Sequence, residues 1–384
     1  MESPLLDLLL AGIDHALERA AKLRWHIHAN PYLGGEEEPT AAVIREQLPW
    51  LDLETVAGTG LIGRIGPPGP SVGLRAELDA LPIHELTDAP HVSEFEGIMH
   101  ACGHDVHMAA LVALLHAAHS VELPVGLTAL FQPREETSPP GAEDVVASGV
   151  LDRYGVAAMV GAHVQPRVET GRVSTGAGAV NAAFDAFEIE VRGVRGHGGY
   201  PHLALDPIGI LASIITGLNE LGARAIDPTH PSVISVGQIE GGTAPNVIAS
   251  SATCRGTIRT TSTADRDILI TAITRMAEGM ASARGTTARV RIIPGGPALI
   301  NSARLVHAVD PLLEQAGLTL VDQSFRSCGS DDFAVYGRDL PILMMFVGAG
   351  EHSLHSCHYL PDDDALRRTA RALAAGYVGV ASTI

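Results

Sequence analysis

The chain carries, at residues 99–105, the sequence Met99-His100-Ala101-Cys102-Gly103-His104-Asp105, directly before the apolar run at residues 108–119. Cys102 and His104 lie two residues apart, so both side chains can point at one ion from a strand end or a loop. A thiolate and an imidazole are common ligands of transition metals. A cysteine taken alone is more often a small buried hydrophobic residue, so the meaning of this stretch depends on partners elsewhere in the chain.

Composition sets the broad class of the protein. The 384 residues are 46% hydrophobic and 18% charged, which is typical of a globular protein with a large core and predicts two domains. The net charge of −18 argues against a general nucleic-acid or anionic-membrane surface. Four cysteines do not suggest a disulfide scaffold, and we see neither a secretory signal nor an apolar run of membrane-spanning length. We therefore expect a cytoplasmic protein without nucleic-acid or membrane partners.

The first and last parts of the chain alternate short apolar runs with helical patterns. The predicted strands cover residues 72–75, 125–131, 157–161 and 342–346, and the predicted helices cover residues 108–119 and 364–381. Strands that alternate with helices predict an α/β fold with a mostly parallel sheet. Polar residues gather just past the strand ends, where open α/β sheets place their ligands.

The pattern changes in the middle of the chain. The strands expected there cover residues 184–191, 233–240, 247–260 and 288–293, and the helices cover residues 207–221 and 264–283. Their order, β-α-β-β-α-β, is the ferredoxin-like pattern. We therefore predict a discontinuous α/β domain at residues 1–181 and 298–384, with a smaller ferredoxin-like α+β domain inserted at residues 182–297.

Five side chains that can bind a metal come from four segments of the α/β part. They are Cys102, His104, Glu136, His163 and His355. One histidine near a strand end is more often structural, but here every segment places its ligand at a predicted strand end or in the following loop. Five mixed ligands exceed what one tetrahedral zinc requires and suit two adjacent ions about 3.5–4 Å apart. Imidazole, carboxylate and thiolate together permit Zn, Mn, Co or Ni.

Glu135 and Glu136 form a second informative pair. Neighbours in an extended segment point to opposite sides, so both reach one site only if the chain bends, and Pro133 favours a bend. One carboxylate would then bind metal while the other serves as general base; the alternative is a solvated acidic loop. Asp79, after a predicted strand, fits a carboxylate that orients a ligand imidazole, or else a strand-end cap.

Four polar residues of the inserted domain are candidates for substrate contact. His197 and His202 lie around a glycine-rich turn, and either imidazole can donate a hydrogen bond to the oxyanion of a tetrahedral intermediate. The alternative is a glycine-rich surface loop. Asn246 and Arg259 can hold a substrate carboxylate, since arginine forms a fork-like pair with that group. A structural ion pair is the alternative for Arg259.

These residues belong to a series of motifs that runs along nearly the whole chain. The motifs are His28-Ala29-Asn30-Pro31 with Glu37 and Thr40, Arg75–Pro82, His100–Asp105, Phe131–Glu136, Gly161–His163, Gly196-His197 with Pro201-His202, Asp206-Pro207, Gly241-Gly242 with Asn246–Ile248, Gly256–Arg259, Ser330–Phe333 and Leu354–Ser356. In this order they resemble the dinuclear metallopeptidase superfamily of aminoacylases, carboxypeptidases and succinyl-diaminopimelate desuccinylases. The resemblance is strongest to its amidohydrolase branch, which includes hippurate hydrolase, auxin-conjugate amidohydrolases and N-acetyl-diaminopimelate deacetylase. Arg134 stands where a small residue is common in that family.

The resemblance implies a role for each candidate residue. It implies that two divalent ions are held by Cys102, His104, Glu136, His163 and His355. It further implies that Glu135 is the general base and Asp79 the orienting carboxylate. The inserted domain would be a lid and dimerisation module, and a lid histidine would act across a homodimer.

We therefore predict a metal-dependent amidohydrolase that cleaves N-acyl amino acids or small peptide-like amides. Glu135 would take a proton from water and return it to the leaving nitrogen, and His197 or His202 would stabilise the oxyanion. Asn246 and Arg259 would bind the carboxylate of the amino-acid half. The alternative enzyme is an aminopeptidase or dipeptidase acting at the same site. The alternative from a different class is a metal-binding protein without catalytic activity. The intact Glu135 and the full ligand set both argue against it.

Overall fold

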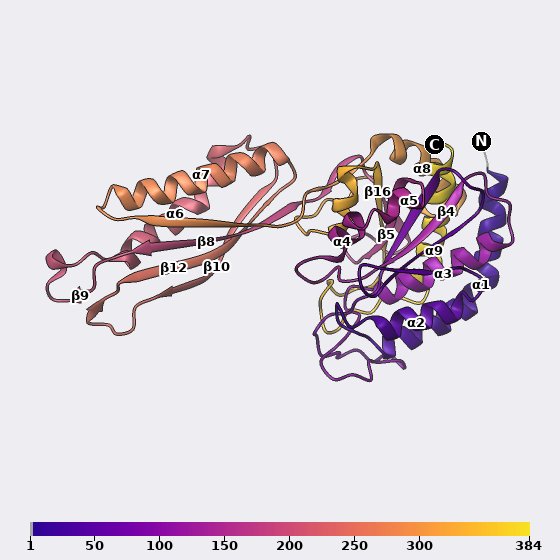
Figure 1. Ribbon diagram of the computed structural model, residues 1–384, viewed down its shortest axis with the longest axis horizontal. Helices are drawn as coiled ribbons and strands as arrows, with labels where there is room; N and C mark the ends of the chain where they lie inside the picture. The colour runs from indigo at the N-terminus through magenta and orange to yellow at the C-terminus, as the bar shows by residue number, and fades with distance from the viewer. Residues whose placement is uncertain (1–2) are drawn as a thin grey trace. The chain divides into compact units, whose positions relative to one another are not determined.

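The computed structural model, described here for residues 3–384, divides into two compact units (Figure 1). The first comprises residues up to Gly178 together with Ile300–Phe325 and Asp332–Ile384, and the second comprises Ala179–Leu299 and Arg326–Asp331. The segment Arg326–Asp331, which we had assigned to the α/β domain, thus belongs to the second unit. The backbone hydrogen bond from Ser327 N to Val180 O is one of the contacts that hold it there.

The first unit contains a large mixed sheet whose centre is parallel. In spatial order its eight strands are β1 (Glu54–Val56), β2 (Gly60–Ile65), β4 (Gly126–Gln132), β3 (Ser71–Glu77), β5 (Val156–Gln165), β16 (Ile342–Gly348), β6 (Arg172–Ser174) and β15 (Thr319–Leu320). The neighbours β4, β3, β5 and β16 run parallel to one another. Every residue of β3, β4 and β16 is buried, which is why these strands are continuous apolar runs rather than alternating ones. The prediction of a mostly parallel α/β sheet is confirmed.

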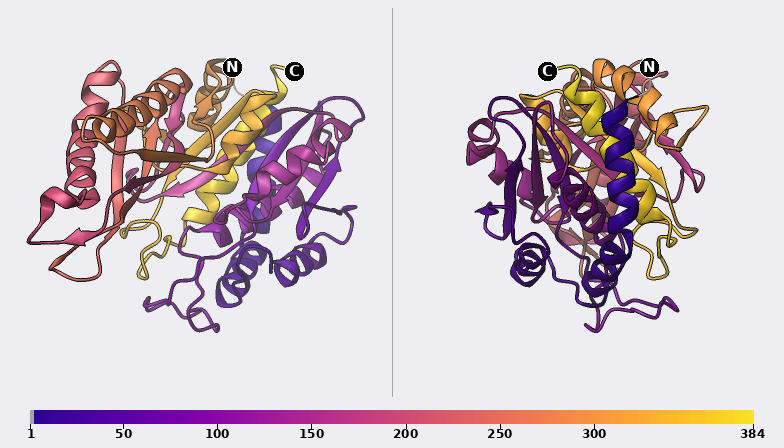
Figure 2. Two further views of the ribbon diagram at one scale, coloured as in Figure 1. Left: turned by 60° about the vertical axis from the view of Figure 1, so that its left-hand side comes forward. Right: turned by 90° about the vertical axis from the view of Figure 1, so that its right-hand side faces the viewer.

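Helices cover this sheet and supply most of the remaining core. They are α1 (Pro4–Ala29), α2 (Glu38–Gln47), α3 (His104–His119), α4 (Gly141–Ala147), α5 (Val150–Arg153), α8 (Ala303–Gln315) and α9 (Ala365–Ala381), with a 3₁₀ segment η2 (Asp332–Arg338). Helices α3 and α9 are almost entirely buried, and α1 packs against both of them. Figure 2 shows α9, in yellow, beside the indigo helix α1. The helix that carries His104 is thus held inside the protein on several sides.

The second unit is a four-stranded antiparallel sheet with two long helices on one face (Figure 1). In chain order its main elements are β8 (Ala183–Arg192), α6 (Pro207–Ala225), β10 (Ser232–Gly241), β12 (Ser251–Thr260), α7 (Thr263–Ser282) and β13 (Ala288–Pro294). The strand order β10-β12-β8-β13 is that of a ferredoxin-like fold. Shorter elements are β9 (Gly196–His197), the 3₁₀ turn η1 (Pro201–Leu203) and β11 (Val247–Ile248). The boundaries between the units fall within β7 (Gly178–Asn181) and β14 (Leu299–Asn301), which pair with each other. The single strand predicted at 247–260 is therefore two strands, β11 and β12.

The carboxyl ends of the parallel strands place the candidate residues at one edge of the first unit's sheet. Asp79 follows β3, Glu135 and Glu136 follow β4, and His355 comes after β16. His163 lies inside β5, because that strand extends to Gln165 and is longer than the predicted one. Since parallel strands end at the same edge, these segments meet there despite their separation in the sequence.

Candidate metal centre

A tight turn before α3 positions Cys102 and His104, both of which are buried. Gly103 between them has a left-handed backbone, with φ of 78°. A Cβ added to Gly103 would lie 2.4 Å from the Val164 side chain of β5. Glycine is the one residue that tolerates both the backbone angle and this close approach. His104 is then the first residue of α3, so the Cys-x-His spacing is realised as a turn leading into a helix.

The five predicted ligands meet in the first unit. Ligand atoms of Cys102, His104 and Glu136 all lie within 4.8 Å of one another. Cys102 Sγ is 3.5 Å from His163 Nε2, and His355 Nε2 is 3.1 Å from Glu136 Oε1. The His355 loop is also tied to the Cys102 turn, because the His355 N–H donates to the Ala101 carbonyl at 2.9 Å. These five side chains therefore form one continuous cluster of candidate metal ligands.

Backbone hydrogen bonds set the tautomers of two of these imidazoles. His104 Nδ1 donates to the Asp79 carbonyl at 2.8 Å, and His163 Nδ1 donates to the Val164 carbonyl at 2.6 Å. In its neutral form each ring then presents an unprotonated Nε2 toward the cluster. His104 Nε2 is buried and has no hydrogen-bond partner among residues 3–384. A buried lone pair of this kind, beside a thiol and a carboxylate, fits a divalent transition-metal ion.

Asp79 acts differently from the prediction. Its backbone carbonyl, rather than its carboxylate, accepts the hydrogen bond from His104 Nδ1. The nearer carboxylate oxygen lies 3.8 Å from that nitrogen. The carboxylate instead accepts the N–H of Glu136 at 2.9 Å through Oδ2. The reason is the position of the strand end, which turns the Asp79 side chain toward the β4 loop and leaves its carbonyl facing α3. Asp79 thus orients His104 through its backbone and Glu136 through its side chain.

The bend that brings Glu135 and Glu136 to one site lies at Arg134, directly after Pro133. Arg134 has a left-handed backbone, with φ of 55°. Beyond this residue Glu136 joins the Cys102–His104 cluster, and Glu135 Oε2 lies 4.0 Å from His104 Nε2. Both neighbouring carboxylates are therefore close to His104, although an extended chain would point them apart.

The charges of the cluster shift the pKa values of its members. Burial raises the pKa of the Cys102 thiol well above its usual range, and the carboxylates of Glu136 and Glu135 raise it further. Burial lowers the pKa of His163 to about 3. Burial alone would raise the pKa of Glu136, but His355 and His104 outweigh it and lower that pKa. A cation bound here would favour the thiolate, since coordination deprotonates a thiol outright.

Sequence reasoning missed a second set of buried polar residues behind the cluster. His107 Nδ1 donates to Glu77 Oε2 at 2.8 Å, and its Nε2 accepts the Val164 N–H at 2.9 Å. His107 lies within reach of His104 and His163, but both of its nitrogens are already used, which makes it a support rather than a ligand. The signal was present, because His104 and His107 are three apart on a helix and so share one face. Glu77 also pairs with the buried Arg75.

His28 lies in another buried network, next to the start of α3. Its Nδ1 is 3.1 Å from Asp105 Oδ2, and its Nε2 is 3.1 Å from Glu85 Oε1. Burial alone would lower the pKa of His28, but the charge of Asp105 and then that of Glu85 raise it to about 9. Arg24 also pairs with Asp105 at 3.0 Å. A protonated His28 therefore links α1, the loop at Glu85 and α3.

This network predicts a stability change above neutral pH. The folded-state pKa of His28 lies above its unfolded value of 6.5, so its stabilisation is complete below pH 6.5 and is lost as pH rises through about 9. The shift corresponds to about 2–3 kcal/mol over that interval. Urea unfolding at pH 6.5 and at pH 9 should show this loss in the natural chain and a clearly smaller one in His28→Gln, with metal content held constant. Equal losses in the two chains would rule out His28 as the titrating group.

The structure places the four predicted substrate residues in the second unit. His197 is in β9 and Asn246 precedes β11, and these strands pair, with Gly198 N donating to Asn246 O at 2.9 Å. His202 is exposed in η1. Arg259, in β12, donates to the Cys328 carbonyl at 2.8 Å and lies 4.9 Å from the Phe184 ring centre. The structure thus brings His197 and Asn246 together, while Arg259 has structural contacts of its own.

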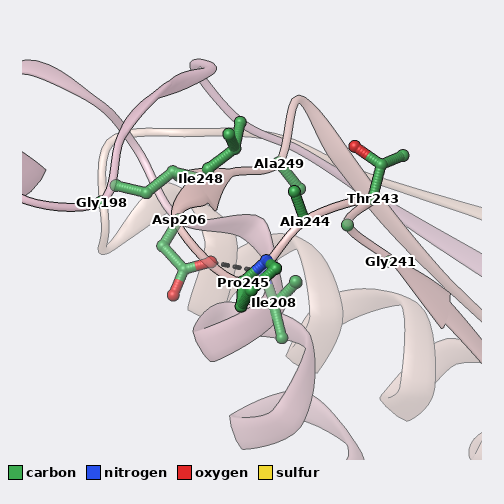
Figure 3. A pocket seen from close by; sticks show the side chains of 11 residues that line it. Gly198, Asp206, Ile208, Gly241, Thr243, Ala244, Pro245, Ile248 and Ala249 are labelled. Atoms are coloured by element: carbon green, nitrogen blue, oxygen red, sulfur yellow. Dashed lines mark hydrogen bonds between the residues drawn. The ribbon is translucent and has the colours of Figure 1, made fainter.

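A pocket of about 590 Å³ lies beside these strands (Figure 3). Its lining residues are Gly198, Asp206, Ile208, Gly241, Gly242, Thr243, Ala244, Pro245, Val247, Ile248 and Ala249. Asp206 caps helix α6, because its Oδ1 accepts the Ile208 N–H at 2.9 Å. Gly198, in the glycine-rich turn of the sequence analysis, lines this pocket, while His197 and His202 of the same turn are exposed at the surface.

Known proteins with similar sequences and folds place the chain in a family. Residues 73–376 match Peptidase family M20/M25/M40. The chain is 34% identical to N-acetylcysteine deacetylase of Bacillus subtilis over 376 residues, which cover 95% of this chain and 98% of that protein. It is 30% identical to N-acetyldiaminopimelate deacetylase of Oenococcus oeni, with 93% and 96% covered. One similar solved structure is the YXEP protein of Bacillus subtilis, which is described as a dinuclear metal-binding peptidase of the M20 family. It superposes on this chain with a TM-score of 0.86 at 31% identity, and the match covers 97% of this chain and 100% of that one.

The chain belongs to Peptidase family M20/M25/M40. It is a hydrolase that acts on amide bonds, and the resemblance noted from the motifs is confirmed. Within residues 3–384, no helix has both the length and the apolar character needed to cross a bilayer.

Proposed function

We propose that this protein is a metal-dependent amidohydrolase that cleaves N-acyl amino acids and releases a carboxylic acid and an amino acid. The observation that carries the proposal is the position of Glu135 beside a complete ligand cluster. Its Oε2 lies 4.0 Å from His104 Nε2, and its side chain is only 11% exposed. The deacetylase names of two relatives support an acyl amino acid as substrate.

The ligand set supports two divalent ions held by Cys102, His104, Glu136, His163 and His355. Bound there, the ions would supply Lewis acidity toward the amide carbonyl and toward water. The dinuclear relative at 31% identity supports this number. Mixed sulfur, nitrogen and oxygen ligands accept Zn, Mn, Co or Ni. Elemental analysis of the purified protein identifies the metal, and fewer than two ions per chain at full activity would contradict the dinuclear arrangement.

Glu135 is the group that moves protons in this proposal. Its carboxylate would take a proton from water and return it to the leaving nitrogen. Asp79 keeps Glu136 in place through the Glu136 N–H and keeps His104 in place through the backbone carbonyl. The burial of these groups keeps bulk water away, which strengthens the electrostatic interactions within the site.

His197, rather than His202, fits the oxyanion donor. The Gly199 N–H donates to His197 Nδ1 at 3.0 Å, so the proton of the neutral ring is on Nε2. That nitrogen is then a hydrogen-bond donor, which is what a developing oxyanion needs. Asn246, joined to the same turn through Gly198, and Arg259 would bind the carboxylate of the amino-acid half. The second unit would then serve as a lid that carries these groups.

The choice between the two histidines gives a direct prediction. His197→Ala should lower kcat about 10²–10³-fold with little change in KM, because an oxyanion donor acts in the transition state. His202→Ala, a change at an exposed residue of the same segment, should keep kcat close to that of the natural chain. Steady-state kinetics on one acyl amino acid measure both. A large loss in His202→Ala with none in His197→Ala would reverse the assignment.

A panel of blocked and unblocked substrates tests the reaction class. N-acetyl and N-benzoyl amino acids should be hydrolysed in the presence of Mn or Zn, and dipeptides with an unblocked amino group should not. Preference for unblocked dipeptides would favour the dipeptidase alternative. Complete inactivity on the whole panel, with two metal ions bound per chain, would favour an inert metal-binding protein.

We also propose that the protein is a homodimer joined through the second unit. Strand β10 is at the edge of that unit's sheet, and it exposes Val233 and Ile239 by 38% and 62%. An exposed edge strand with apolar side chains is a ready surface for pairing with a second copy. Sedimentation should give twice the chain mass, and a monomer at micromolar concentration would refute the dimer.

A reducing compartment, the cytoplasm, suits this chemistry. All four cysteines are free of disulfides, and Cys102 must remain reduced so that its thiolate can serve as a ligand. Fractionation of the native cells should recover the protein with cytoplasmic markers, and recovery with secreted proteins would contradict this location.

A further inference from the structure

Glu37, at the start of α2, is a buried carboxylate surrounded by hydrogen-bond donors. The residue is 0% exposed. Its Oε1 accepts the Arg134 N–H at 2.8 Å, and its Oε2 accepts the Gly35 N–H and the Thr59 hydroxyl, both at 2.7 Å. A buried carboxylate is tolerated only when its oxygens are satisfied in this way. Of these three donors, the Arg134 N–H leads directly to the candidate catalytic residues.

The peptide groups around Arg134 are held from both sides. Glu37 accepts its N–H, and the Gly141 N–H donates to its carbonyl at 2.9 Å. Gly141 is required there, because an added Cβ would lie 1.8 Å from the Pro133 carbonyl oxygen. Between these two contacts Arg134 has its left-handed backbone, with φ of 55°, which side chains with a Cβ disfavour. The surrounding hydrogen bonds therefore maintain a conformation that the residue would not adopt by itself.

The turn at Arg134 decides where the next two side chains point. Glu136 reaches the cluster of Cys102 and His104, and Glu135 also approaches His104. The Glu136 N–H is in turn held by Asp79. Glu37 and Asp79 thus hold the backbone on the two sides of Glu135.

We propose that Glu37 is a positioning residue that holds the left-handed turn at Arg134 and so directs Glu135 and Glu136 to the same site. The inference rests on the proposed function, in which Glu135 is the base and Glu136 a ligand. Glu37 itself touches neither substrate nor metal. It acts on the turn through the Arg134 N–H. Its effect on the positions of Glu135 and Glu136 can therefore be distinguished from a general contribution to the stability of the fold.

Three variants of the cobalt-loaded enzyme test this role. Glu37→Leu removes both acceptors and should lower kcat about 10–100-fold, the usual range for residues that orient metal ligands, with little change in KM. It should also change the visible absorption of bound Co²⁺, because Glu136 is displaced. Glu37→Gln keeps one acceptor and should restore part of both properties. Thr59→Val removes only a donor to the other oxygen, so kcat and the cobalt spectrum should stay as in the natural chain even if urea unfolding shows lower stability.

The outcomes separate the positioning role from its alternatives. If both Glu37 variants had the kcat and the cobalt spectrum of the natural chain, the proposal would be overturned. A loss of kcat in Thr59→Val equal to that in Glu37→Gln would also overturn it, because such a loss would reflect general destabilisation. If Glu37→Leu fails to fold, the comparison of Glu37→Gln with Thr59→Val gives the same decision. If the natural chain hydrolyses no acyl amino acid, the proposed function fails, whereas the cobalt spectra still report whether Glu37 holds the turn.

Discussion

Glu135→Gln should abolish most of the hydrolysis while leaving the metal content unchanged. The amide has nearly the shape of the carboxylate but cannot accept the proton of water, and general acid–base groups contribute about 10²–10⁴-fold. Steady-state kinetics and elemental analysis on the same preparation measure the two quantities. The effect should appear in kcat, because proton transfer belongs to the transition state and not to substrate binding.

The adjacent residue provides a matched control for this prediction. Glu136→Gln makes the same chemical change one position further, but at a side chain that lies within 4.8 Å of the Cys102 and His104 ligand atoms. It should lose metal as well as activity. Glu135→Gln with kcat within a few-fold of the natural chain would exclude Glu135 as the base. Equal metal loss in the two variants would mean that both carboxylates are ligands.

Cys102→Ala should remove both metal and activity. The thiol sulfur lies 3.5 Å from His163 Nε2 and within 4.8 Å of the ligand atoms of His104 and Glu136, so its loss removes a candidate ligand that is close to three others. We expect fewer than two ions per chain and a fall in kcat of at least about 100-fold, because metal polarisation contributes several kcal/mol to the transition state. Metal analysis after dialysis and kinetics with added metal measure the result.

Cys328→Ala is the control for this second variant. Cys328 is an exposed thiol of the second unit, so its loss should change neither metal content nor rate. Full metal content in Cys102→Ala would show that the thiol is not a ligand. Recovery of natural activity at high metal concentration would show that Cys102 contributes affinity alone.

The motif residues predicted the location of the cluster but not its internal contacts. Short continuous apolar runs identified β3, β4, β5 and β16, and the polar residues after them had to converge because parallel strands end at one edge of the sheet. Hydrogen-bond partners are different, because each depends on a backbone orientation that no residue type specifies. Asp79 shows this clearly: its carbonyl serves His104 and its carboxylate serves Glu136.

Supporting residues were the least visible in the sequence. His107 could have been found from its spacing to His104 on one helix face. Glu37 belongs to the first of the motifs, but nothing in the sequence indicated its role, since its partner Arg134 is distant in the chain and offers only a backbone N–H. A side chain that acts on a remote peptide group leaves no pattern of its own.

By itself, the sequence determined the class of this protein: an α/β fold with an inserted ferredoxin-like unit, and a set of candidate metal ligands that includes a thiol and a paired carboxylate. These follow from hydrophobic periodicity and side-chain chemistry, which are local properties. Only the tertiary structure decided that the backbone turns left-handed at Arg134 and that His104 presents its unprotonated Nε2. The reason is physical: a left-handed turn and a tautomer are selected by hydrogen bonds from other segments, and those segments become neighbours only when the chain folds.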